Sequence, residues 1–192
     1  MIFEKPAVGI SVYRDVFDAN LFIEKLEEEV NNEWSEIEWI GSSVGPSGSE
    51  TNYRTSASAS MAYLLPPYPE TELSKIFVND VKSKIDPVIK DYIYEYQISS
   101  GISEIWHVLK YTKGAEYKAH YDKGPGAPRV FSMVAYLSDV EEGGSLEFPY
   151  FDVDIPSKNG TVVLFPSCFS YLHIAHPVEK GIKYSLVSWF GY

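Results

Sequence analysis

The chain has 192 residues, of which 45% are hydrophobic and 22% are charged, a composition typical of one folded domain rather than a disordered chain. Its 16 Lys and Arg residues against 27 Asp and Glu residues leave a formal net charge of −11. That charge argues against nucleic acid as a partner, because such binding needs cations that replace phosphate counterions. The one cysteine, Cys168, excludes an intramolecular disulfide and a cysteine-based metal cage.

Targeting signals are not evident in the sequence. The first residues, Met1 to Pro6, lack a basic segment followed by an apolar run, so we expect no signal peptide. No stretch approaches the roughly 18 consecutive apolar residues of a membrane span. We therefore expect a cytoplasmic protein that does not bind membranes.

The first half of the chain predicts two helices. Asp18 is placed to cap a helix that runs to Val30, with apolar residues three and four positions apart. A second helix is predicted from Glu70 to Asp86, and the pair Asp86-Pro87 ends or kinks it. Gly, Ser and Pro dominate the segment between the helices, and we expect residues 41–60 to form a lid.

From about residue 98 the pattern changes to short runs that are typical of strands, separated by Gly and Pro turns. The predicted strands are Ile102–Tyr111, Arg129–Leu137, Ser145–Phe148, Thr161–Phe165, Tyr171–Ala175 and Lys183–Phe190. Many short strands of this kind indicate a sandwich, barrel or jelly roll. We expect one domain over residues 1–192, with a helical support over about 15–97 and a β core over about 98–192.

The strongest chemical signal is His120-Tyr121-Asp122. Residues two apart in a strand point to the same face, so the imidazole and the carboxylate can converge. A histidine from a distant strand would complete the two-histidine, one-carboxylate set that is diagnostic of non-haem Fe(II) oxygenases. Taken alone the motif is weak, and an ordinary surface His-Asp pair is the alternative.

Four motifs together resemble those of the prolyl 4-hydroxylases, in the same order along the chain. They are Arg54-Thr55-Ser56, the segment Tyr111 to Asp122, the segment Arg129 to Pro149 and the segment His173 to Lys183. The resemblance implies an α+β fold with a double-stranded β-helix core (jelly roll, cupin-like) flanked by N-terminal helices. It also implies a dioxygenase that depends on Fe(II) and 2-oxoglutarate.

The resemblance implies that His120, Asp122 and His173 are the catalytic metal ligands, because His173 has the family's spacing to Pro177 and Lys183. His176 cannot ligate together with His173, since residues three apart in a strand face opposite sides. We expect His176 at the rim of the pocket, and we expect His107 to line the pocket or to be packed in the interior.

Further residues take their predicted roles from the same resemblance. Lys183 is expected to be catalytic as well, by binding the distal carboxylate of 2-oxoglutarate. Tyr111 and Tyr136 are expected to donate hydrogen bonds to the same carboxylate through their hydroxyl groups. Three other positions match peptide-groove residues of plant-type relatives, namely Glu104, Arg129 and Trp189. The alternatives are a surface ion pair for the first two and core packing for Trp189.

The predicted activity is hydroxylation of prolyl residues at C4 in peptides or proteins, with succinate and CO2 as co-products. Fe(II), 2-oxoglutarate and O2 are the implied cofactors and co-substrates, and the sequence leaves open whether ascorbate is also required. Two alternatives remain: the same chemistry on another residue, a free amino acid or a small metabolite, and a non-catalytic metal-binding β-helix module. The lack of disulfides favours a compact enzyme of bacterial or viral type, and the sequence leaves the oligomeric state open.

Overall fold

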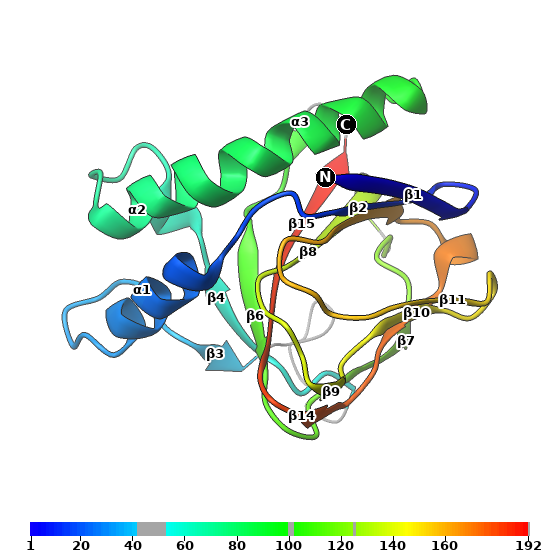
Figure 1. Cartoon of the computed structure of the whole chain (residues 1–192). Helices are drawn as coiled ribbons and strands as arrows, with labels where there is room; N and C mark the ends of the chain where they lie inside the picture. The colour runs from blue at the N-terminus through cyan, green and yellow to red at the C-terminus, as the bar shows by residue number, and fades with distance from the viewer. Residues whose placement is uncertain (42–52, 100–101, 125, 192) are drawn as a thin grey trace.

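A computed structural model describes residues 1–41, 53–99, 102–124 and 126–191 (Figure 1). The helical elements are α1 (Asn20–Val30), η1 (Ala62–Leu64), α2 (Glu72–Ile76), η2 (Phe77–Lys82), α3 (Ser83–Glu95) and η3 (Phe169–Tyr171). The strands are β1 (Ile2–Ala7), β2 (Ile10–Arg14), β3 (Ile40–Gly41), β4 (Ala57–Ser60), β5 (Ile102–Ser103), β6 (His107–Tyr111), β7 (Tyr117–His120), β8 (Arg129–Tyr136), β9 (Glu142–Gly143), β10 (Leu146–Phe148), β11 (Val153–Ile155), β12 (Val162–Pro166), β13 (His173–Ala175), β14 (Val178–Lys180) and β15 (Lys183–Gly191).

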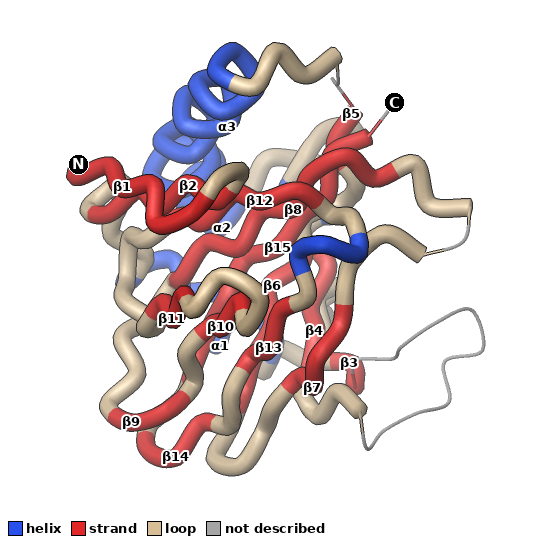
Figure 2. Tube along the Cα trace, turned by 90° about the vertical axis from the view of Figure 1, so that its right-hand side faces the viewer, coloured by secondary structure: helices blue, strands red, loops and turns tan. Residues whose placement is uncertain are grey.

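The described strands form two facing antiparallel sheets. The major sheet has the order β1-β2-β12-β8-β15-β6-β4-β3, with β5 paired to β15, and the minor sheet has the order β11-β10-β13-β7. A short ribbon of β9 and β14 lies at one end (Figure 2). Neighbours in the sheets are far apart in sequence, as in the pairing of β2 with β12. The topology therefore brings distant segments together between the two sheets.

Helices α1, α2 and α3 cover the outer face of the major sheet, opposite the minor sheet (Figure 1). The period-2 alternation of β8 explains this layering. Phe131 and Ala135 are fully buried in the cluster that includes the helices, whereas Tyr136 belongs to the cluster between the sheets. Phe22 of α1 meets Phe77 with ring centroids 5.3 Å apart, a contact that joins two helical elements in the outer core.

The start of α1 differs from the prediction by one position. The helix begins at Asn20 and its N-cap is Ala19, which makes no side-chain capping bond. Asp18 instead accepts a hydrogen bond from the Asn20 N–H at 3.0 Å and another from Asn159 Nδ2 at 2.7 Å. The carboxylate of Asp18 thus satisfies one free N–H of the first turn from outside the helix, while also fixing the turn before β12.

Of the two outcomes predicted at Asp86-Pro87, an end or a kink, the structure excludes the end. The helical segment runs from Glu72 to Glu95, with a π-helical stretch over Phe77–Lys82 just before the proline. Proline in a helix removes one hydrogen bond and crowds the preceding turn. The helix continues because Ile85, Val88, Ile89 and Tyr92 of α3 are buried against the sheet, and this apolar contact outweighs the local cost.

The N-terminal part contributes strands as well as helices. The β1–β2 hairpin adds to one edge of the major sheet, and β4 pairs with β6 further along it. Within the predicted lid, residues 42–52 lie outside the described residues, while Ala57–Ser60 is a strand of the major sheet. Most predicted strands of the C-terminal half are present, although Ile102–Tyr111 divides into β5 and β6, and Tyr171 belongs to η3.

Candidate active site

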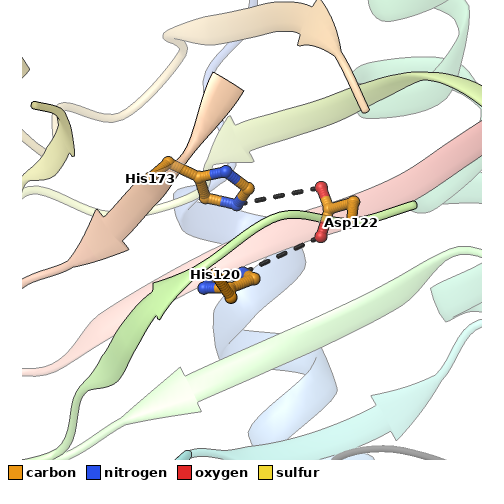
Figure 3. Close-up of side chains that lie close together, drawn as sticks. All are labelled: His120, Asp122 and His173. Atoms are coloured by element: carbon orange, nitrogen blue, oxygen red, sulfur yellow. Dashed lines mark ion pairs between the residues drawn. The ribbon is translucent and has the colours of Figure 1, made fainter. Parts of the chain in front are cut away.

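Strands β7 and β13 bring His120 and His173 together. The two histidines are direct partners in the antiparallel register of these strands, and Asp122 follows β7 two residues later. The Nε2 atoms of His120 and His173 each lie 3.8 Å from one carboxylate oxygen of Asp122 (Figure 3). Because the three donor atoms lie within 4.8 Å of one another, this cluster has the spacing of a metal centre.

Backbone carbonyl groups fix the orientation of both imidazoles. His120 Nδ1 lies 2.7 Å from the Lys118 carbonyl oxygen, and His173 Nδ1 lies 3.0 Å from that of Tyr171. A carbonyl oxygen only accepts hydrogen bonds, so each Nδ1 carries the proton and each Nε2 presents its lone pair to the cluster. This is the arrangement in which histidine binds a metal through Nε2.

The charge state of the cluster also suits a divalent cation. Burial and the neighbouring His173 lower the pKa of His120, which keeps its imidazole neutral at pH 7. For Asp122 burial acts to raise the pKa, but His173, His120 and hydrogen bonds with Ser132 and Trp189 together bring it below its ordinary value. His120 therefore offers a neutral imidazole and Asp122 a carboxylate, the forms that metal binding requires.

Lys183 lines the same pocket as the cluster. It lies in β15 opposite Tyr111 of β6, is 2% exposed, and donates a hydrogen bond to the Gly144 carbonyl oxygen at 2.7 Å. Its Nζ lies 4.9 Å from the ring centroid of Tyr111 and 5.4 Å from that of Tyr136. This burial lowers the pKa of Lys183 to about 7.

The polar groups around Lys183 are incompletely satisfied. No carboxylate of the described residues forms an ion pair with Lys183, and the buried hydroxyl of Tyr136 has no hydrogen-bond partner in the described part of the chain. Buried polar groups are normally paired. The pocket that joins them to His120, Asp122 and His173 can therefore take an anion at the Lys183 end and a metal at the other.

The three predicted groove residues meet beside the cluster. Arg129 Nε and Nη2 donate to the two carboxylate oxygens of Glu104, each at 2.6 Å, and Arg129 Nη1 donates to the backbone carbonyl of Asp122 at 3.0 Å. The guanidinium also lies over the ring of Trp189, 3.9 Å from its centroid. Arg129 thus connects Glu104 and Trp189 to the backbone of Asp122.

The other two histidines lie outside the cluster. His176 Nε2 is 2.6 Å from Glu147 Oε2, and both side chains are partly exposed. His107 is half-buried, and its Nδ1 lies 3.5 Å from the Ser58 hydroxyl oxygen. It lines an adjoining groove of about 270 Å³ that shares Arg54, Leu109, Val187 and Trp189 with the metal pocket.

Sequence reasoning missed Ser132 and gave Arg54 no firm role. Ser132 is buried in the middle of β8, where it hydrogen-bonds Asp122; a lone polar residue in the run Val130 to Ala135 was the available signal. Arg54 lies over the ring of Tyr117 at 4.9 Å from its centroid and lines the pocket. No local sequence pattern predicts that Arg54 contacts Tyr117, because the two residues are far apart in the sequence.

Part of the chain is similar to a known family of proteins. Residues 106–191, which include the cluster and Lys183, match the family model described as the 2OG-Fe(II) oxygenase superfamily. The match covers a little under half of the chain, and over these residues the chain is similar to that superfamily. Three of the four motifs that resemble prolyl 4-hydroxylases lie within the matched residues. The superfamily that this model describes uses Fe(II), 2-oxoglutarate and O2.

Among curated relatives, the chain is 31% identical over 115 residues to probable prolyl 4-hydroxylase 9 of Arabidopsis thaliana, covering 45% of this chain and 40% of that protein. It is 31% identical over 126 residues to prolyl 4-hydroxylase subunit alpha-2 of Gallus gallus, covering 55% of this chain and 23% of that protein. The matches thus span less than half the length of these two relatives.

Solved structures confirm the predicted jelly-roll fold. A Pseudomonas putida prolyl-4-hydroxylase has a TM-score of 0.66 at 19% identity, with 95% of this chain and 92% of that chain covered. A Trichoplax adhaerens prolyl hydroxylase, crystallised with a fragment of hypoxia inducible factor, has a TM-score of 0.74 at 18% identity, with 95% and 83% covered. None of the described helices is both long and apolar enough to cross a membrane.

Proposed function

We propose that this protein is an Fe(II)- and 2-oxoglutarate-dependent dioxygenase that hydroxylates prolyl residues of peptides or proteins at C4. One observation carries the proposal: a single pocket joins the cluster of His120, Asp122 and His173 to the buried amine of Lys183. A metal-binding module without turnover needs the cluster but has no use for a buried cation in the same pocket. An enzyme that uses a dicarboxylate needs both.

Each of these side chains has a role in the proposal. His120, Asp122 and His173 would hold Fe(II). Lys183 would pair with the distal carboxylate of 2-oxoglutarate, and the Tyr136 hydroxyl, which has no partner among the described residues, would donate to it. Bound Fe(II) would supply the O2 chemistry that oxidises a C–H bond of the substrate, coupled to the conversion of 2-oxoglutarate to succinate and CO2. The apolar walls of the pocket exclude water from the reacting atoms.

A peptide is the substrate that the surroundings of the site favour. The groove of about 270 Å³ beside the metal pocket is lined by Arg54, His107 and Trp189, among others, and offers an aromatic ring, a cation and hydroxyl groups. Relatives named as prolyl 4-hydroxylases support proline as the target. In this proposal Trp189 contacts the substrate, and the Glu104–Arg129 pair holds the wall of the groove.

The test is incubation of the purified protein with Fe(II), 2-oxoglutarate, O2 and a proline-rich peptide. We expect proline to gain the mass of one oxygen atom, with one succinate formed for each hydroxylation. His120→Ala removes a metal ligand and should abolish both products. His176→Ala is the matched control, because this histidine pairs with Glu147 outside the cluster, and it should retain activity.

Two results would contradict parts of the proposal. Succinate formation without any hydroxylated peptide would keep the oxygenase chemistry and assign it to another residue, a free amino acid or a small metabolite. Failure to bind Fe(II) under anaerobic conditions, in folded protein, would contradict the metal site itself. Omitting ascorbate from the reaction decides whether a reductant is also required.

The proposal includes a cytoplasmic setting of bacterial or viral type. Its support is the single cysteine, Cys168, since these 192 residues cannot form a disulfide among themselves. Higher activity or stability of the protein under oxidising than under reducing conditions would argue against a cytoplasmic setting.

A further inference from the structure

A second groove lies between the C-terminal end of α1 and the segment that leads to α2. Its volume is about 230 Å³, and it shares no residue with the metal pocket or with the groove beside that pocket. The residues that line it are Glu29, Trp34, Glu36, Ile37, Tyr63, Leu64, Tyr68, Pro69, Thr71 and Leu73. None of the residues proposed for catalysis contributes to it, so its role requires a separate explanation.

Three aromatic side chains dominate this groove, which we call the aromatic groove. Trp34 is 85% exposed and Tyr68 is 47% exposed, while the rings of Tyr63 and Tyr68 lie with their centroids 4.8 Å apart at 58°. Large rings left in solvent beside an apolar floor are a typical recognition surface. Aromatic-lined grooves of this kind bind polyproline II helices, whose pyrrolidine rings pack between the aromatic side chains.

The floor of the aromatic groove is apolar and already packed. Ile37, Leu64 and Leu73 are each 5% exposed and belong to the core cluster that supports the helices. The groove is therefore held by the fold on its inner side, and its exposed aromatic side chains are free to contact a ligand. A preformed surface loses little conformational entropy on binding.

Negative charge on the rim of the aromatic groove favours a positively charged partner. Glu29 and Glu36 line it, and an adjoining hollow adds Glu28 and Glu72. Among the described residues that line the two hollows, the one cation is Lys25, and its Nζ is paired with Glu28 at 2.7 Å. An acidic rim around aromatic rings is complementary to a ligand that carries positive charge.

We propose that the aromatic groove binds a proline-rich segment in the polyproline II conformation that carries Lys or Arg next to its prolines. Prolines would pack against Trp34, Tyr63 and Tyr68, and the basic side chains would face Glu29 and Glu36. The binding step is independent of catalysis. Only its consequence rests on the proposed function: a substrate held here has a raised effective concentration at the metal pocket.

The test measures binding of a fluorescently labelled peptide of Pro-Pro-Arg repeats by anisotropy, with the full chain free of metal so that no turnover occurs. Trp34→Ala should weaken binding about tenfold, as loss of a central aromatic contact does at interfaces. Tyr94→Ala is the matched control, because Tyr94 is 84% exposed on α3 and does not line the groove. We expect it to bind as the wild type does.

Charge is tested with a second pair of measurements. Glu36→Lys should weaken binding of the Pro-Pro-Arg peptide and strengthen binding of a Pro-Pro-Glu peptide. A peptide of Ala-Ala-Arg repeats should bind at least about tenfold more weakly than the proline peptide, because it lacks the preformed helix. Equal binding of the two arginine peptides, or unchanged binding by Trp34→Ala and Tyr68→Ala, would overturn the proposal.

The outcomes also separate this inference from the proposed function. If Trp189→Ala abolishes binding and Trp34→Ala does not, the peptide binds at the metal pocket, the inference is wrong and the proposed function is untouched. If Trp34→Ala weakens binding but the wild-type protein with Fe(II), 2-oxoglutarate and O2 never hydroxylates the peptide, the groove stands and the prolyl activity fails.

Discussion

Lys183 shows what burial costs a single side chain in this protein. The folded-state pKa of about 7 lies below the ordinary value of 10.5, so folding must overcome the cost of a buried charge whenever the amine is protonated. Below pH 7 the amine is protonated in both the folded and the unfolded state, so folding bears the full free-energy cost of burying the charge. This cost decreases as the pH rises from 7 toward 10.5, because the folded state loses the proton while the unfolded state keeps it.

Lys183→Met is therefore expected to stabilise the protein without ligands, and more so at low pH. The variant should gain about 2 to 3 kcal/mol more in free energy of unfolding at pH 6 than at pH 9, relative to wild type. Chemical denaturation at the two pH values measures this difference. The same variant should lose binding of 2-oxoglutarate. A gain that is the same at both pH values would show that the amine is not buried as the structure has it.

Arg129 acts through Asp122 rather than on substrate alone. Its Nη1 donates a hydrogen bond to the backbone carbonyl of Asp122, and its Nε and Nη2 donate to the carboxylate of Glu104. Lysine cannot reproduce this planar set of three contacts. We therefore regard Arg129 as a positioning residue for the metal ligand.

Arg129→Lys is expected to lower the affinity for Mn(II), a stand-in for Fe(II), by about 10-fold or more, as loss of a group that orients a metal ligand does. Titration with Mn(II) under electron paramagnetic resonance measures this without turnover. Arg14→Lys is the control, because Arg14 also donates two hydrogen bonds to one carboxylate, that of Glu4, on the exposed β1–β2 hairpin. Equal Mn(II) affinity in the two variants would contradict the positioning role.

At the scale of elements, one close approach of backbone segments joins α1 to the major sheet. Gly160 precedes β12 with φ of +78°, and a Cβ there would overlap the carbonyl oxygen of Phe17. Its own carbonyl accepts a hydrogen bond from the Val16 N–H at 2.9 Å. This contact fixes the path of the chain from β2 into α1. A side chain at position 160 is excluded both by the lack of space and by the positive φ.

Gly160→Ala is expected to destabilise the fold by more than about 1 kcal/mol, since strain and overlap add. The matched variant is Gly114→Ala, which has a similar φ of +81° but open space around the added Cβ. Thermal unfolding of the two variants separates conformational strain from overlap. If Gly114→Ala proves as destabilising as Gly160→Ala, the close approach to Phe17 contributes nothing.

At the scale of the whole molecule, the metal cluster joins β7 to β13, and Lys183 belongs to the major sheet. Ligands that bind both ends of the pocket should therefore tie the two sheets together and stabilise the folded state by mass action. At a concentration of about 100 times its dissociation constant, a ligand adds about 2.7 kcal/mol to the free energy of unfolding.

We expect Mn(II) to raise the melting temperature of the wild type, and 2-oxoglutarate to raise it further once Mn(II) is present. Lys183→Met should retain the Mn(II) shift and lose the additional shift, because the anion end of the pocket is removed while the metal ligands stay. Differential scanning calorimetry in the absence of O2 measures both. A 2-oxoglutarate shift that survives in Lys183→Met would place the co-substrate elsewhere.

The local pattern of the sequence determined much of this protein. The spacing of His120 and Asp122 and the short alternating runs after residue 98 predicted one side of the metal cluster and a β-rich core, because these features depend on neighbours along one strand. The resemblance of the motifs supplied His173 and Lys183. The local rule for proline allowed an end or a kink at Asp86-Pro87, and the apolar face that α3 buries decides against the end.

Tertiary structure decided what depends on distant segments. The pairing of β7 with β13 places His173 against His120, and no spacing along the chain encodes that register. The β1–β2 hairpin went unrecognised until its pairing with β12 was seen. For the same reason Arg129 connects Glu104 to Asp122, and Trp34 and Tyr68 line the same aromatic groove. Contacts between side chains far apart in sequence exist only once the chain has folded and buried its core.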